Sequence, residues 1–131
     1  MEKIIFSNKL YAMLLRNSFK KEGITFFTEN DSSQQLAYMK HPKGKVIEPH
    51  FHNSVKRIIH DTQEVLYIKK GLLKVDFYDV HKNTLGSEFL YEGDLIILIQ
   101  GGHGFSVVED LEMIEIKQGP YLGDNDKVRF K

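Results

Sequence analysis

The chain has 131 residues, 41% of them hydrophobic, which suits one domain with a single core. Its 18 basic and 18 acidic residues balance, which excludes the strong positive charge of a nucleic-acid-binding or acidic-membrane-binding surface. The absence of cysteine excludes disulfides and thiolate metal sites. We find no apolar run of about 18 residues and no signal-peptide pattern, which favours a cytoplasmic protein.

Residues 1–23 differ in pattern from the rest and predict a short amino-terminal helix. Apolar side chains recur there at intervals of three and four residues, at Leu10, Tyr11, Leu14, Leu15 and Phe19. Ser7 is a suitable amino-terminal cap, and Gly23 is a suitable end. We expect this helix to pack on the outside of the domain or against a second subunit.

From Ile24 onward, short β-rich segments alternate with turns rich in Asn, Asp, Ser and Gly. The expected strands cover residues 24–28, 34–40, 45–52, 63–70, 72–79, 85–91, 95–99 and 111–118. A polar tail follows over residues 119–131. Short strands at a spacing of about ten residues predict an all-β sandwich or small barrel, in one domain that spans residues 1–131.

The stretch from Glu48 to Gly71 carries the candidate chemistry. His50 and His52 lie two residues apart, so both imidazoles project from the same face of an extended strand. Glu64 opens the next expected strand. Two imidazoles and a carboxylate that converge on one pocket predict a site for a divalent metal ion or a site for acid–base chemistry. In an enzyme, His50, His52 and Glu64 would be the catalytic residues.

The spacing of His50, His52, Glu64 and Gly71 resembles the first sequence motif of the cupin family. Eleven residues separate His52 from Glu64, where the family usually has three or four. The resemblance extends over residues 44–118. It implies a jelly-roll β-barrel that holds one metal ion inside.

A second cupin-like motif lies further along the chain. Gly93-Asp94 is followed by an apolar strand and by the bend Gly101-Gly102-His103. Carried over position by position, the resemblance implies that the metal ligands are His50, His52, Glu64 and His103. Such a set suits Zn, Fe, Mn, Ni or Co and leaves two octahedral positions open for water or substrate.

Two further resemblances concern sugars. Residues 111–130, with Gly119-Pro120-Tyr121 at their centre, are similar to the end of the cupin domain in type II phosphomannose isomerases. The size of the chain and its His-x-His strand resemble the small cupin ketoisomerases and epimerases of nucleotide-linked deoxysugars, which work without a metal. These resemblances imply a sugar, sugar-phosphate or nucleotide-sugar ligand, such as surface polysaccharide biosynthesis uses.

The segment Asn53–Thr62 supplies further candidates. Lys56 and Arg57 could bind a phosphate or carboxylate if this segment folds over the barrel mouth, or they could lie on a solvated surface loop. His60 could replace His103 as a ligand. Tyr67 and Tyr78 are candidates by residue type for binding substrate or donating a proton, and packing in the barrel is the alternative role for both.

Three functions remain open. The first is a metal-binding cupin that acts on or binds a sugar-like ligand, with isomerisation or epimerisation ahead of other reactions. The second is a metal-free isomerase or epimerase in which a histidine is the base. The third is a binding module without catalysis. For all three we expect a homodimer, because jelly-roll sheets leave edge strands exposed and the amino-terminal segment could exchange between chains.

Overall fold

β-Strands are the regular structure of this chain, apart from a single 3₁₀ turn. The computed structural model describes residues 1–131. In chain order the elements are β1 (Glu2–Phe6), β2 (Lys9–Leu15), β3 (Gly23–Phe26), β4 (Ala37–Lys40), β5 (Glu64–Tyr78), β6 (Thr84–Leu90), β7 (Leu95–Leu98), β8 (Gly102–Lys117) and the 3₁₀ turn η1 (Gly123–Asp126). None of the helical structure is long and apolar enough to span a membrane. The predicted all-β class is confirmed.

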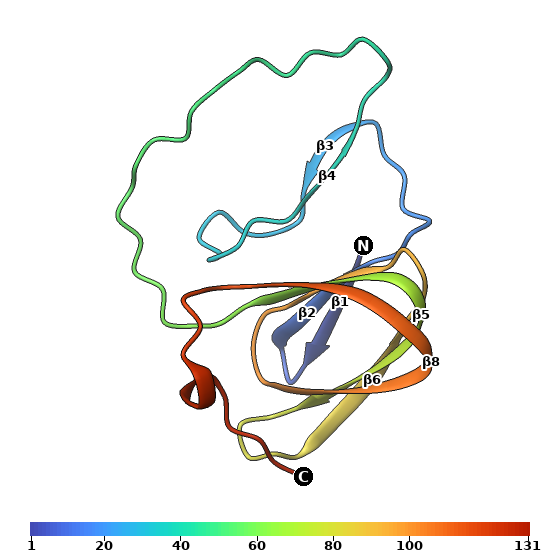
Figure 1. Ribbon diagram of the computed structural model, residues 1–131, viewed down its shortest axis with the longest axis vertical. Coiled ribbons are helices and arrows are strands. Elements are labelled where there is room, and N and C mark those ends of the chain that lie inside the picture. Colours follow the sequence, from blue (N-terminus) through green and yellow to red (C-terminus); the bar gives the residue numbers. More distant parts are fainter.

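A six-stranded antiparallel sheet curls into half a barrel (Figure 1). Its strand order is β1-β2-β7-β5-β6, and β8 pairs with β5. The long strand β5 joins the two ends of the curl, because Glu64–Tyr67 pair with β7 and Leu73–Tyr78 pair with β6. β8 follows the other edge of β5 along its whole length. One edge of β8 is therefore an open edge of the sheet.

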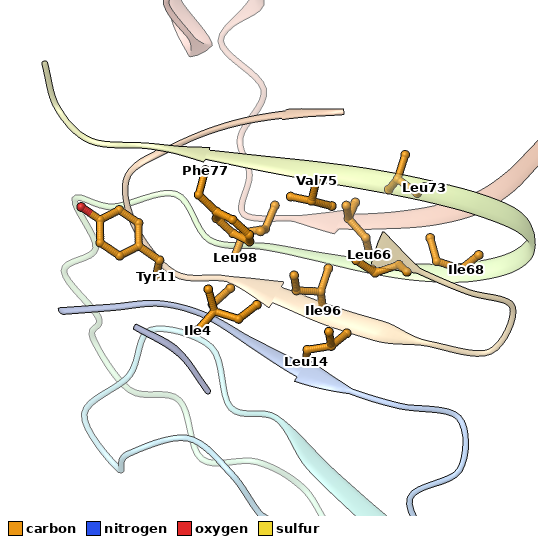
Figure 2. Packing of buried hydrophobic residues seen from close by; sticks show 12 residues of the cluster. Ile4, Tyr11, Leu14, Leu66, Ile68, Leu73, Val75, Phe77, Ile96 and Leu98 are labelled. Atoms are coloured by element: carbon orange, nitrogen blue, oxygen red, sulfur yellow. The ribbon is translucent and has the colours of Figure 1, made fainter. Parts of the chain in front are cut away.

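The hydrophobic core lies on the inner face of this curled sheet. Figure 2 shows side chains of β2, β5 and β7 directed toward one another across the core. The buried cluster consists of Ile4, Tyr11, Ala12, Leu14, Leu66, Ile68, Leu73, Val75, Phe77, Leu90, Ile96 and Leu98. Full burial of one such large side chain contributes about 1.5–3 kcal/mol. This cluster therefore determines which face of each strand points inward.

The amino-terminal segment is a β-hairpin, so the helix predicted over residues 1–23 is wrong. Ser7 and Asn8 form the two-residue turn between β1 and β2, with φ angles of 49° and 62°. Positive φ at both positions is the turn geometry that matches the twist of a hairpin. Tyr11–Leu14 are buried in succession, so both faces of β2 are covered, and β1 and β7 pair with its two edges. A strand with both faces covered carries apolar residues at helix-like intervals as well.

The two strands expected over residues 63–70 and 72–79 are a single strand, β5, which bends at Gly71. The pairing register between β5 and β8 shifts on both sides of this glycine. Gly71 has a φ of 96°, and a Cβ atom there would lie 2.1 Å from the carbonyl oxygen of Asp110. Glycine is therefore required for the bend and for the close approach of the two strands.

Gly71→Ala is expected to lower the free energy of unfolding by about 2 kcal/mol or more, because the new methyl group must displace backbone atoms as well as hold a positive φ. Unfolding in denaturant measures this loss. Gly44→Ala is the matched control, since Gly44 has a φ of 90° but no atom within 4 Å of an added Cβ. Equal losses of unfolding free energy in the two variants would show that the close approach to Asp110 does not affect stability.

The buried carboxylate of Asp94 accepts several hydrogen bonds at the turn before β7. Asp94 is only 3% exposed. Its Oδ2 accepts hydrogen bonds from Arg16 Nη1 at 2.9 Å and from the Tyr91 N–H at 2.8 Å, and its Oδ1 accepts one from the Asn17 N–H at 2.9 Å. The Asp94 carbonyl accepts a further hydrogen bond from the Ile68 N–H. Asp94 therefore joins the ends of β2 and β6 to the middle of β5.

β3 and β4 form a separate two-stranded sheet, and a long segment leads from it back to β5. We call this segment, residues 41–62, the arch. Figure 1 shows the arch, in green, running away from the curled sheet before it returns to β5. The strand expected over Lys45–His52 lies in the arch and pairs with no other strand of the chain. Residues 42–62 are all exposed.

Candidate functional site

A buried glutamate and a histidine meet at one end of the curled sheet. Glu64 is the first residue of β5, and His103 is the second residue of β8. The His103 Nε2 atom lies 3.3 Å from the Glu64 Oε2 atom, with side-chain exposures of 28% and 10%. His103 is placed opposite the buried Phe77 in the β5–β8 pairing, so its ring faces the interior of the half-barrel. This pair is the centre of the candidate site.

The bend before β8 aims His103 inward. Gly101 has a φ of 79°, and a Cβ atom there would lie 2.3 Å from the Tyr11 ring. A larger residue at this position would push the bend away from β2 and move the start of β8. The imidazole of His103 also stacks on the ring of Phe105, with centroids 5.2 Å apart and an interplanar angle of 20°.

The environment of Glu64 favours its ionised form. The contact with His103 is the largest cause and lowers the pKa of Glu64 below its usual value, and burial of the carboxylate opposes this effect only in part. Lys117 adds a smaller attraction in the same direction as His103. An ionised carboxylate beside an imidazole can bind a cation or accept a proton.

The pair lines a half-open cavity of about 470 Å³. The lining residues are Thr62, Glu64, Tyr78, Gly101, Gly102, His103, Gly104, Asp126, Lys127, Val128, Arg129, Phe130 and Lys131. They come from the start of β5, the end of β5, the start of β8 and the carboxy-terminal tail. The tail thus forms one wall of the cavity.

Two contacts hold the tail against the sheet. The Lys117 ammonium group forms an ion pair with Asp126 at 2.9 Å, which raises the pKa of Lys117. The rings of Phe130 and Tyr78 pack edge to face, with centroids 5.1 Å apart, and the Lys82 ammonium group lies 5.9 Å from the centre of the Phe130 ring. Basic side chains on the tail are therefore kept at the mouth of the cavity.

The other two expected ligands lie in the arch. His50 and His52 are exposed neighbours whose ring centroids are 5.2 Å apart, as expected for alternate residues of an extended segment. The His50 Nδ1 atom is 2.8 Å from the Glu48 carbonyl oxygen. One chain therefore forms two pairs, His50 with His52 and Glu64 with His103. Within one chain, no group of three or more His, Cys, Asp or Glu side chains is placed to hold a metal ion.

The remaining predicted residues lie in different places. Tyr78 lines the cavity, whereas Tyr67 is 40% exposed and is paired with Leu95 and Ile114 on the outer face. Lys56 and His60 are exposed in the arch. Arg57 lines a second hollow, with Asn30–Ser33 and Asp61, that shares no residue with the first.

Three basic residues of the cavity were not predicted from the sequence. Lys127, Arg129 and Lys131 alternate along the tail and all line the cavity. The recurrence of a basic residue at every second position was the available signal, and the residues between them, Val128 and Phe130, line the same cavity. The position of the tail beside Glu64 and His103 depends on the packing of Phe130 and on the Lys117–Asp126 ion pair.

Comparisons with models of protein families, with characterised proteins and with solved structures yield no match to this chain.

Proposed function

We propose that this protein is a metal-binding cupin that binds, and chemically converts, a small anionic sugar derivative at the cavity around Glu64 and His103. The observation that carries the proposal is the contact of a buried carboxylate with an imidazole in the wall of a cavity that basic side chains also line. A carboxylate and neutral imidazoles are suitable ligands for Zn, Fe, Mn, Ni or Co. His50 and His52 would complete the ligand set.

The basic tail supports an anionic ligand. Lys127, Arg129 and Lys131 line the same cavity, together with Tyr78 and Thr62. The three basic residues would bind the anionic group of the ligand, and Tyr78 and Thr62 would contact the rest of it. An arginine guanidinium can donate two parallel hydrogen bonds to one phosphate group, and lysine adds positive charge. A sugar phosphate or a nucleotide sugar has a phosphate at one end and hydroxyl or carbonyl groups at the other, which matches this distribution of side chains.

A metal-free isomerase or epimerase is the second candidate, because Tyr78 lines the cavity together with His103 and Glu64. A histidine can remove a proton next to a sugar carbonyl, and a tyrosine on the other side can return one. In this candidate Glu64 would hold the imidazole in the orientation that the proton transfer needs. A binding protein without catalysis would use the same cavity and the same basic tail.

Metal content tests the first candidate. Protein purified without a histidine tag is expected to bind about one Co²⁺ ion per chain. His103→Ala is expected to lower the Co²⁺ affinity by about a hundredfold or more, because loss of a residue that only supports a ligand already lowers metal affinity by about ten- to a hundredfold. His81→Ala is the matched control, because His81 is an exposed histidine in the β5–β6 turn. Isothermal titration with Co²⁺ measures both variants. Equal affinities in wild type and His103→Ala would contradict metal binding at this cavity, and the metal-free candidate would then take its place.

A further inference from the structure

The inner face of the half-barrel lacks a cover along β8. Phe105 and Val107 are placed opposite Val75 and Leu73, which are fully buried, so all four side chains point to the same inner face. Phe105 and Val107 are nevertheless 38% and 62% exposed. The neighbour that would cover them belongs on the open edge of β8, where no strand of the chain pairs. A long strand edge with unpaired backbone groups is a ready template for another strand.

The arch, like the open edge of β8, has backbone groups without hydrogen-bond partners, and several of its large apolar side chains are exposed. From Val46 to Thr62, no backbone group makes a hydrogen bond to another backbone group. Phe51 is 100% exposed, and Val46 and Ile58 are more than 70% exposed. The arch also continues from a two-stranded sheet, which by itself is marginally stable in water. Extended backbone and large apolar side chains are thus held in solvent without partners in the same chain.

We propose that Lys45–His52 of one copy of this chain adds as an antiparallel strand to the open edge of β8 in a second copy, and that the exchange is reciprocal. The open edge of β8 in each copy would then be paired with a strand of its partner. Because His50 and His52 would reach the face that holds Glu64 and His103, each site would consist of two residues from each copy. This last consequence rests on the proposed function, whereas the exchange of strands does not.

The register that completes the site also pairs opposite charges. Every strand pair of the curled sheet is antiparallel. In an antiparallel register that sets His52 of one copy opposite His103 of the other, His50 falls opposite Phe105 and Glu48 opposite Val107. Lys45 and Lys43 then lie beside the acidic stretch of Glu109, Asp110 and Glu112, where the register of β8 is irregular. Opposite charges at facing positions stabilise a strand pair. The eight residues from Lys45 to His52 span about 27 Å, the same length as residues 103–110 of β8.

The arch points to a second copy rather than to closure on its own sheet. In Figure 1 most of the arch lies away from the curled sheet, and only its end returns to the start of β5, beside the end of β8. Its two ends are tied, one by the β3–β4 pairing and the other by the hydrogen bond from the Gln63 N–H to the Gln118 side chain. Two copies related by a twofold axis would cover both open edges at once, and a chain with a net charge of zero presents no overall repulsion to its copy.

Disulfide trapping tests the exchange without reference to any metal. The chain has no cysteine of its own, so Lys45→Cys with Asp110→Cys creates one defined pair. Facing residues of antiparallel strands lie about 4.5–5.5 Å apart between Cα atoms, which suits a disulfide. Mild oxidation is expected to convert most of the double variant to covalent dimers of twice the 15.2 kDa chain mass, seen on non-reducing gels and by mass spectrometry.

Three controls define the result. Each single cysteine variant, and the pair Lys45→Cys with Lys3→Cys, are expected to stay largely uncrosslinked, because Lys3 lies on β1 at the opposite edge of the sheet. A disulfide formed within one chain, or no disulfide, overturns the exchange. Crosslinked dimers that bind no Co²⁺ would keep the exchange and remove the metal-binding function. An uncrosslinked monomer that binds Co²⁺ would remove the exchange and keep that function.

Discussion

Two variants that each fail to bind metal are expected to restore metal sites when they are combined in one dimer. The first variant carries His50→Ala and His52→Ala, and the second carries Glu64→Gln and His103→Ala. If each site takes its two pairs from different chains, a mixed dimer contains one site with no substitution and one site with four. Co²⁺ binding in the isolated mixed dimer should therefore return to about half of the wild-type stoichiometry, because one of its two sites is intact.

The experiment uses co-expression with two histidine-free affinity tags, so that mixed dimers can be isolated. A mixed dimer of His50→Ala with His52→Ala is the matched control, because both substitutions lie in the same segment and every site then lacks one histidine. Co²⁺ titration of each purified dimer measures the recovery. Absence of binding in the first mixture, with binding intact in wild type, would place all four residues of a site in one chain.

Asp94→Ala is expected to have the largest effect on folding. The substitution leaves the Arg16 guanidinium without its buried partner and leaves the N–H groups of Asn17 and Tyr91 without an acceptor. Arg16 is partly exposed and retains Glu2, at 2.8 Å, as a second partner, so the loss from the ion pair is reduced. Together these losses should lower the free energy of unfolding by about 3 kcal/mol.

Thermal unfolding followed by circular dichroism measures this effect, and a loss of that size should lower the Tm by about 10 °C in a chain of this length. Asp31→Ala is the matched control, because Asp31 is an exposed aspartate of the turn after β3. It is expected to change the Tm by no more than about 2 °C, as surface substitutions usually do. A Tm for Asp94→Ala close to that of the control would contradict the structural role of the buried carboxylate.

Most of the strands after residue 63 could be predicted from the sequence, but the first half of β8, residues 102–110, and the amino-terminal segment could not. Residues 85–91 and 95–99 are bounded by turn residues, and their positions agree with β6 and β7 to within about two residues. In contrast, Tyr11–Leu14 form a central strand that is buried on both faces, and such a strand has no alternation of polar and apolar residues. The positive φ angles at Ser7 and Asn8 gave no signal, because neither residue is glycine.

Part of the candidate site could likewise be predicted from the sequence, and part could not. Residue type and spacing identified Glu64, the resemblance to the cupin motif added His103, and the structure places these two in contact across β5 and β8. Spacing also predicted that His50 and His52 lie side by side, which they do. Local periodicity could not show where the second pair lies relative to the first, because that depends on which strand edge the arch meets.

By itself, the sequence determined the all-β class, most of the strands and the types of residue available for chemistry. These properties depend on local alternation, turn residues and composition, which a chain carries without folding. Only the tertiary structure decided that the basic tail lines the cavity, that Asp94 is buried among donors, and that β8 has an open edge. Each of these depends on residues far apart in the chain, whose contacts are formed by packing and by the pairing of distant strands.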